Sequence, residues 1–108
     1  MTTPFERLAE LDRLVHEPAR LAIMSALSAC ESADFLFLQR ITGLSKGNLS
    51  SHLARLEEAA LVSVTKEFVG RVPRTQVALT PGGRERLEAY WRELQKLARA
   101  ARHWRPTS

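Results

Sequence analysis

The chain has 108 residues, 44% of them hydrophobic and 26% charged, which suits one small domain with a modest core. Its 16 basic residues exceed its 12 acidic ones, giving a net charge of +4. No apolar run approaches the roughly 18 residues of a membrane span, and the N-terminus lacks the basic-then-apolar order of a signal peptide. We therefore expect a cytoplasmic protein without a membrane partner. The lone cysteine, Cys30, agrees with a reducing compartment because it cannot form an internal disulfide.

The basic excess lies entirely in the second half of the chain. Residues 1–60 carry six basic and eight acidic side chains, whereas residues 61–108 carry ten basic and four acidic ones. This distribution is typical of a chain whose second half binds an anionic partner while the first half serves as scaffold. For the last quarter, a solvated basic tail is the favoured explanation of the excess.

A first helix is predicted near the N-terminus. Pro4 suits a first-turn position, and Phe5, Leu8 and Leu11 follow it at helical spacing, which predicts a helix running to about His16.

Two further helices are predicted before residue 45. Pro18 begins a second helix, rich in small and large apolar residues, that ends at Cys30. The apolar run at residues 35–38 predicts a strand stub that continues as a short third helix. Gly43 suits the left-handed turn that ends such a helix.

The stretch from Gly43 to Val62 predicts a fourth helix with a distinctive outer face. Ser45 is a natural N-cap, so the helix begins at Lys46, and an apolar stripe follows at Leu49, Leu53, Leu56 and Ala60. The opposite face is small and polar, and its residue types suit contacts with base edges and phosphates. An ordinary amphipathic surface helix is the alternative. A short helix, a turn containing glycine and a helix with a polar outer face form a helix-turn-helix arrangement.

A β-hairpin is predicted after this helix. Val62, Val64 and Phe68 alternate with polar residues, and alternation resumes at residues 75–80 after a turn at residues 70–74. The turn places Arg71 and Arg74 at the tip, where they can reach phosphates or a minor groove. The alternative is that arginine simply keeps a turn soluble.

The last helix has Thr80 as its N-cap and Pro81 at its first position, and it carries an apolar seam longer than a small core can cover. Together with the first helix, this seam is the predicted homodimer interface, and the alternative is that the helix folds back on its own domain. The predicted interface consists of Phe5, Leu8, Leu11, Leu87, Tyr90, Trp91, Leu94, Leu97, Ala98 and Ala101.

Catalytic and metal sites are not indicated. The three histidines have no cysteine, serine or carboxylate at a spacing that suggests a nucleophile and base, so we expect no enzyme and no cofactor. Asp12 and His16 stand one turn apart, but a surface pair is favoured because no third ligand is near them in the sequence.

The order of these elements resembles the small winged helix-turn-helix transcriptional regulators of the MarR-like and ArsR-like groups. The motifs that carry the resemblance are residues 43–53 (GLSKGNLSSHL), 56–59 (LEEA), 69–75 (VGRVPRT) and 79–83 (LTPGG). The fold class is thus mainly α with a small β-hairpin wing, an α+β fold around a three-helical bundle. One domain would span residues 1–108, with a recognition helix at about 46–59, a wing at about 61–80 and a dimerisation helix at about 81–104.

The resemblance implies a homodimer that binds double-stranded DNA, with a recognition helix in each major-groove half-site and a wing in each flanking minor groove. The expected DNA-binding residues are Lys46, Gly47, Asn48, Ser50, Ser51, Arg55, Lys66, Arg71 and Arg74, with Arg84 as a further phosphate contact. We expect a sequence-specific regulator, a repressor, whose small-molecule effector is unknown. The metal-sensing members' paired cysteines are absent, so we expect no metal site. The alternative function is a winged helix used only for protein contacts, which the acidic Glu57 and Glu58 favour.

Overall fold

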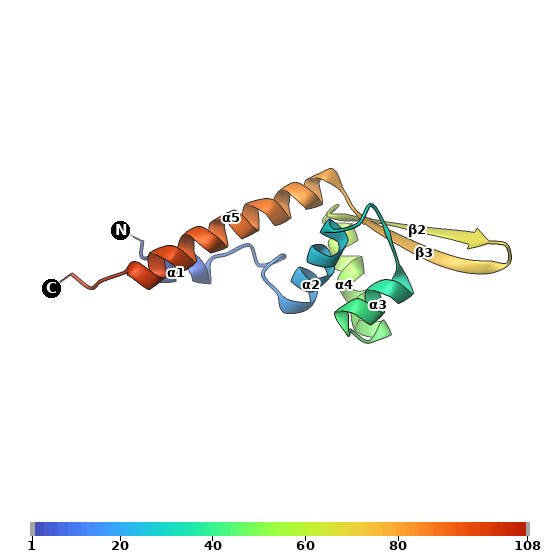
Figure 1. Cartoon of the computed structure of the whole chain (residues 1–108), viewed down its shortest axis with the longest axis horizontal. Helices are drawn as coiled ribbons and strands as arrows, with labels where there is room; N and C mark the ends of the chain where they lie inside the picture. The colour runs from blue at the N-terminus through green and yellow to red at the C-terminus, as the bar shows by residue number, and fades with distance from the viewer. Residues whose placement is uncertain (1, 108) are drawn as a thin grey trace.

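Residues 2–107 are described by a computed structural model and contain five helices and a three-stranded antiparallel sheet (Figure 1). This is the mainly α architecture with a β-hairpin that the sequence predicts. Within this range no helix is both long and apolar enough to cross a membrane. The elements are α1 (Pro4–Ala9), α2 (Pro18–Ser28), β1 (Ala33–Asp34), α3 (Phe35–Thr42), α4 (Lys46–Glu58), β2 (Val62–Val69), β3 (Val72–Leu79) and α5 (Pro81–His103).

The first helix is shorter than predicted, because α1 ends at Ala9 instead of continuing to His16. Asp12 Oδ1 accepts hydrogen bonds from the backbone N–H groups of Leu14 (3.0 Å) and Val15 (3.3 Å). A short polar side chain that bonds its own backbone in this way competes with helical hydrogen bonding and favours a turn. The chain therefore bends after α1 and enters α2 from a different direction.

The predicted strand stub was placed two residues too late. The strand β1 is Ala33–Asp34, and Ala33 pairs with Val77 of β3. The Asp34 side chain then accepts a hydrogen bond from the N–H of Leu36 (3.2 Å) and caps α3. Because Asp34 caps the helix, the apolar run that follows becomes helical from its first residue, Phe35.

The turn between α3 and α4 agrees with the prediction. Gly43 has a φ of 72°, the left-handed conformation that ends α3. Ser45 accepts a hydrogen bond from the N–H of Asn48 (3.1 Å), so α4 begins at Lys46. The apolar stripe is one residue shorter than predicted, because α4 ends at Glu58 and Ala60 is exposed with a φ of 61°.

The hairpin turn is tighter than predicted and consists of Gly70 and Arg71 alone. Gly70 has a φ of 66°, as the first central position of a type II′ turn requires. In a hairpin with a two-residue turn, the pair that flanks the turn is the hydrogen-bonded one, here Val69 with Val72. The next pair, Phe68 with Pro73, therefore takes a non-hydrogen-bonded position. The missing N–H of Pro73 therefore removes no bond between the strands.

Only the base of the hairpin contributes to the core. Val62 and Val77 are buried and Val64 is half-buried, as the alternation predicts, but Phe68 is 74% exposed. The tip of the hairpin extends beyond the helices that cover the sheet (Figure 1). The core consists of α2, α3, α4, the base of the sheet and the inner face of α5 as far as Leu97. Its largest fully buried side chains are Ile23, Met24, Leu27, Leu38, Leu49, Leu56, Leu87 and Leu97.

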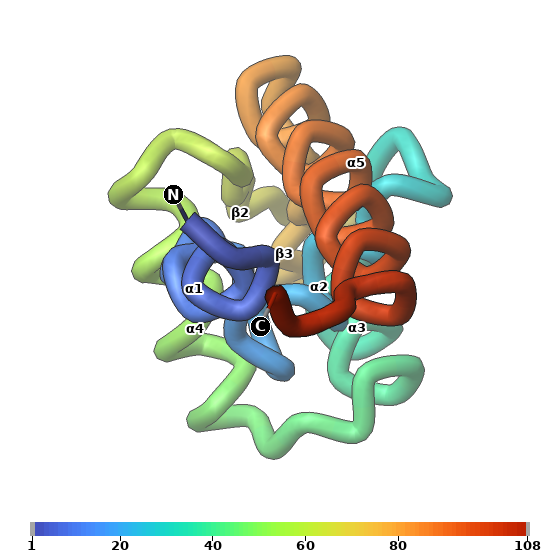
Figure 2. Tube along the Cα trace, turned by 90° about the vertical axis from the view of Figure 1, so that its left-hand side faces the viewer, coloured from blue at the N-terminus to red at the C-terminus, as the bar shows by residue number. Residues whose placement is uncertain are grey.

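The molecule is elongated, with extents of 69 × 25 × 21 Å. Its radius of gyration is 16.9 Å, whereas a compact domain of this length has one of about 13 Å. The hairpin extends from one end of the helical body, and the second half of α5 extends from the other with α1 packed against it (Figures 1 and 2). We call α1 together with residues 91–104 the terminal arm.

One backbone junction joins α4, the hairpin and α5. The N–H of Thr80 donates to the carbonyl of Leu61 (3.1 Å), and the Thr80 hydroxyl donates to the carbonyl of Ala60 (2.7 Å). Gly83 lies so close to Leu61 that a Cβ on Gly83 would stand 2.0 Å from the Leu61 carbonyl oxygen. Glycine is therefore required at this position so that α5 can begin against the end of α4. We call residues 60, 61, 80 and 83 the junction.

We predict that Gly83→Ala destabilises the protein by about 3 kcal/mol, because rigid backbone on both sides must move to admit the methyl group. Gly82→Ala is the matched control, since its Cβ would meet only the Thr80 hydroxyl at 3.8 Å. The control should be neutral or stabilise α5 by up to about 1 kcal/mol. Urea denaturation of both variants measures the difference, and equal stabilities would contradict the role of the junction.

Candidate nucleic-acid interface

The polar face of α4 is open to solvent. All six predicted DNA-binding residues of this helix are exposed, and none is covered by another part of the chain that the structure describes. His52, at the edge of this face, is half-buried. The exposed residues are Lys46, Gly47, Asn48, Ser50, Ser51 and Arg55.

A groove of about 320 Å³ separates α4 from the hairpin. Lys46 and Ser50 line it from α4, and Lys66 lines it from β2. The fold thus brings together three predicted DNA-binding residues that are up to 20 positions apart in the sequence. Glu57 also lines the groove and adds one negative charge to it, which sequence spacing did not reveal.

The two wing arginines lie in different places. Arg71 occupies the turn, as predicted. Arg74 lies within β3, opposite Glu67 in the register, so its place at the tip was predicted wrongly. Side chains alternate between the faces of a strand, so Arg74 and Glu67 point to the face opposite Lys66. Arg74 is thus separated from the groove and has an acidic cross-strand neighbour.

The Arg84 side chain binds another part of the same chain. Its Nη1 donates a hydrogen bond to the carbonyl of Ser28 (3.0 Å) at the end of α2. A cation at this position satisfies a helix-terminal carbonyl and interacts favourably with the helix dipole. The predicted phosphate contact of Arg84 would require this bond to break.

A buried arginine connects α4 to the segment that leads out of α1. Arg20 is only 8% exposed. Its Nε donates to the carbonyl of Leu14 (2.6 Å), its Nη2 donates to the carbonyl of Arg13 (3.3 Å), and its Nη1 lies 3.3 Å from Nδ1 of His52 on α4. The structure thus assigns His52 a packing contact with α2 at the back of the polar face. The sequence offered no sign of this arginine, which resembles any other charged residue on a helix.

Glu17 completes this polar cluster. Its Oε2 lies 3.9 Å from Arg20 Nη1 and 3.7 Å from His52 Nδ1. Burial disfavours the ionised carboxylate, but hydrogen bonds from the N–H groups of Arg20 and Ala19 outweigh this effect, so the pKa of Glu17 lies below its usual value. The carboxylate is therefore ionised at neutral pH and caps α2.

A family comparison agrees with this geometry. Residues 19–98, which include α2 to α4, the hairpin and most of α5, match the winged helix DNA-binding domain. The chain belongs to this family. In the winged helix fold, β2, β3 and their turn form the wing, and α4 occupies the position of the helix that is called the recognition helix.

Two archaeal proteins are similar to this winged helix chain over nearly their whole length. An uncharacterized protein of Methanocaldococcus jannaschii is 31% identical over 88 residues, which cover 81% of this chain and 95% of the relative. A transcriptional regulator homologue from Pyrococcus horikoshii is 30% identical, with a TM-score of 0.82 over 91% of this chain and 96% of that structure. A MarR family regulator from Silicibacter pomeroyi shares the fold, with a TM-score of 0.65 at 23% identity, and this chain covers 62% of it. The predicted resemblance to winged helix regulators is therefore confirmed.

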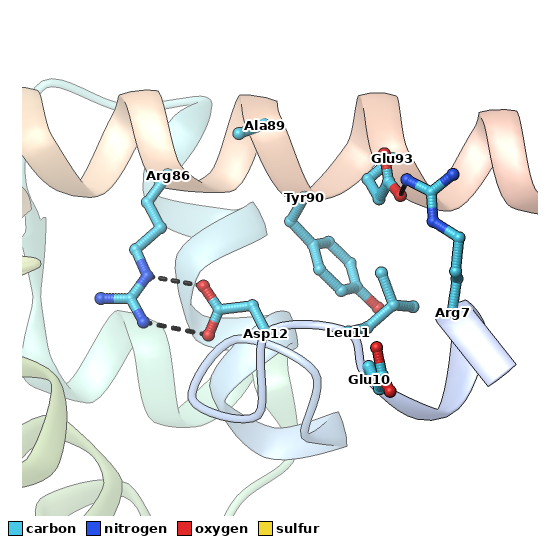
Figure 3. A pocket seen from close by; sticks show the side chains of 8 residues that line it. All are labelled: Arg7, Glu10, Leu11, Asp12, Arg86, Ala89, Tyr90 and Glu93. Atoms are coloured by element: carbon cyan, nitrogen blue, oxygen red, sulfur yellow. Dashed lines mark hydrogen bonds and ion pairs between the residues drawn. The ribbon is translucent and has the colours of Figure 1, made fainter. Parts of the chain in front are cut away.

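A cavity of about 290 Å³ lies between α1, the following loop and α5 of the winged helix protein (Figure 3). Two ion pairs line it: Arg7 contacts Glu93 at 2.6 Å, and Arg86 contacts Asp12 through both carboxylate oxygens, at 2.6 and 3.0 Å. The hydrogen bond from Arg86 holds the pKa of Asp12 below its usual value. Both cations that line the cavity, Arg7 and Arg86, thus already have an acidic partner, so neither is free to bind an acidic ligand.

Tyr90 closes the cavity from α5. Its hydroxyl lies 2.5 Å from Nδ1 of His16. Burial raises the pKa of this hydroxyl. The predicted Asp12 and His16 surface pair therefore does not form, because each side chain contacts α5 instead. Among residues 2–107 no three side chains of the metal-binding types come together.

Part of the predicted dimer seam belongs to the protomer's own core. Leu11, Leu87, Tyr90 and Leu97 are each no more than 6% exposed. The chain itself covers them, so these four side chains are not available to a partner, and this portion of α5 folds back on its own domain. The remaining six predicted residues are exposed or half-buried: Phe5, Leu8, Trp91, Leu94, Ala98 and Ala101.

We predict that Arg20→Leu destabilises the protein by about 3 kcal/mol, because it leaves two carbonyls and the Glu17 carboxylate without their buried cation. Arg13→Leu, at an exposed position, is the matched control and should change stability by less than about 0.5 kcal/mol. Urea denaturation measures stability, and hydrogen exchange shows where the protection is lost. Protection should fall in residues 46–58 more than in α3. Unchanged exchange in α4 would contradict the connection between Arg20 and the recognition helix.

Proposed function

We propose that this winged helix protein is a sequence-specific transcriptional regulator that binds double-stranded DNA as a homodimer and represses transcription in the cytoplasm. The observation that carries the proposal is the shared groove: the solvent-exposed polar face of α4 and the basic wing lie on the same side of the body. A dimer bound across two adjacent half-sites would exclude other proteins from that stretch of duplex, which is why we infer repression.

The recognition helix would enter the major groove with its N-terminal end. Asn48 suits bidentate bonding to adenine, while Lys46 suits guanine or a phosphate. Ser50 and Ser51 are short enough to let the helix approach the bases. A methyl group on Gly47 would meet no atom within 4 Å, so the backbone at this position lies open to the duplex. Phosphate contacts would come from Arg55, Lys66 and Arg71 together with Lys46.

The homodimer is supported by the shape of the chain. The terminal arm extends away from the body. Within the arm, Phe5 and Trp104 make an edge-to-face contact, with their ring centroids 5.2 Å apart. These two rings are 47% and 41% exposed. A two-layer arm of this kind buries too little apolar surface to be stable alone, so a second copy packed along it would supply the missing contacts. Twofold symmetry would then place two recognition helices about 34 Å apart.

The DNA proposal is tested with a duplex selected from a random pool by the full chain. Four cations per protomer, or eight per dimer, predict a slope of log affinity against log salt of about −7. Asn48→Ala should weaken the selected duplex about tenfold or more and leave nonspecific DNA unaffected, whereas Arg71→Ala should weaken both and make the slope shallower by about two units per dimer. Fluorescence anisotropy at several salt concentrations measures both effects.

Arg99→Ala is the matched control, because Arg99 is an exposed arginine on the arm, at the end opposite the wing. It should change neither affinity nor slope. A flat salt dependence for the native chain would contradict the DNA function. It would favour the alternative, a protein-interaction module, for which the Glu57 carboxylate in the groove is the supporting observation.

The dimer has its own prediction. Sedimentation equilibrium should give about twice the 12.2 kDa protomer mass. Phe5→Glu should weaken the dimer at least about tenfold, because it places a charge in an apolar seam. Phe37→Glu, at an exposed phenylalanine on α3 and away from the arm, should leave the mass unchanged. A native chain that sediments as a monomer at every concentration would contradict this part of the proposal.

A further inference from the structure

Bulky apolar side chains are exposed at the end of the wing. Phe68 is 74% exposed, Val69 52% and Val72 60%, and Pro73 beside them is exposed as well. Phe68 lies directly opposite Pro73 in the register, so their side chains share one face of the hairpin. Apolar side chains collected at the end of a projecting hairpin indicate a contact surface, because water is an unfavourable environment for them.

The charges around this apolar tip indicate the class of partner. Between residues 64 and 76 the chain carries Lys66, Arg71 and Arg74 against the single acidic residue Glu67. An apolar side chain flanked by cations fits a partner with an anionic rim and an apolar interior. The DNA minor groove has this composition once a base step opens, with phosphates on both rims and base faces between them.

The position of Phe68 fits the same partner. Phe68 projects from the same face of β2 as Lys66, which lines the groove beside the recognition helix. Two residues along a strand correspond to about 7 Å, so the phenyl ring lies one step farther from the body than the Lys66 side chain. With α4 in the major groove, a side chain about 7 Å farther from the body than Lys66 would reach past the phosphate backbone to the adjacent minor groove.

We propose that Phe68, supported by Pro73, inserts into a base step of the minor groove and bends the duplex; this inference rests on the proposed DNA-binding function. The minor groove is about 6 Å wide, and the two strand axes of the wing alone lie about 5 Å apart, so the tip fits only where the groove has opened. An inserted apolar side chain unstacks the step, widens the groove and bends DNA toward the major groove.

The insertion also contributes to sequence preference. Pyrimidine–purine steps such as TA and CA/TG unstack more readily than others. Selected duplexes should therefore carry such a step at the position of each wing, outside the bases that the recognition helix contacts. This preference arises from DNA deformability and requires no hydrogen bond between the wing and a base.

The test uses a selected duplex of about 30 base pairs, with donor and acceptor dyes at its ends and 2-aminopurine at the step beneath the wing. Binding of the native chain should shorten the end-to-end distance and raise the 2-aminopurine fluorescence. Phe68→Ala should lose at least half of both changes while affinity falls by no more than about tenfold. Phe68→Leu should retain them, because leucine is also an apolar wedge. Both variants should fold normally, since the side chain lies outside the core.

Phe37→Ala is the matched control, because it removes an exposed phenyl ring from α3 without altering the wing, and it should bend DNA as the native chain does. Bending that is unchanged in Phe68→Ala would overturn the inference. A native chain that binds the duplex but leaves it straight would overturn the inference alone, whereas a chain that binds no duplex would overturn the proposed function as well. A changed sedimentation coefficient in Phe68→Ala without DNA would show that the ring contacts a second copy, which also overturns the inference.

Discussion

The close contact between Gly83 and Leu61 determines how the functional elements of this winged helix protein are arranged. Recognition helix, wing and α5 all begin or end at the junction, where Thr80 bonds the backbone of Ala60 and Leu61. A side chain larger than hydrogen at position 83 would collide with the Leu61 carbonyl. The angle between the helix and the wing, and hence the groove between them, therefore depends on one backbone approach in a well-packed region.

The two ends of the molecule are built differently. The body buries a continuous apolar core, whereas the N-terminal segment is held against α5 by a few apolar contacts and by two partly exposed ion pairs. Ion pairs of this kind contribute less than about 1 kcal/mol each, so the arm depends mainly on its apolar seam. Arg20 joins the two ends physically, because it bonds the segment after α1 and also contacts His52 on the recognition helix.

The groove and the wing carry both basic side chains, which attract an anionic partner, and acidic side chains, which weaken that attraction. Lys46, Lys66 and Arg71 supply positive charge around the groove, while Glu57 lies within it and Glu67 lies opposite Arg74. Cations raise affinity for any duplex, whereas acidic groups lower it for all sequences alike. In the proposed function, specificity would therefore come from the polar residues of α4 and from the shape of the DNA.

Local sequence signals determined the elements and most of their ends, because caps and turns depend on neighbouring residues: Ser45, Gly43 and Thr80 act as their residue types predict. The same signals identified an exposed polar face on α4. Predictions from local patterns were wrong where a residue's position depends on a partner far away in the sequence. Asp12 ends α1 and bonds Arg86, Arg20 is buried beneath His52, and four seam residues of α5 and the N-terminal segment enter the protomer's own core. Burial and long-range pairing are properties of the packed chain, so only the tertiary structure could decide which charges lie inside, which apolar residues remain exposed and which side of the body the wing shares with the recognition helix.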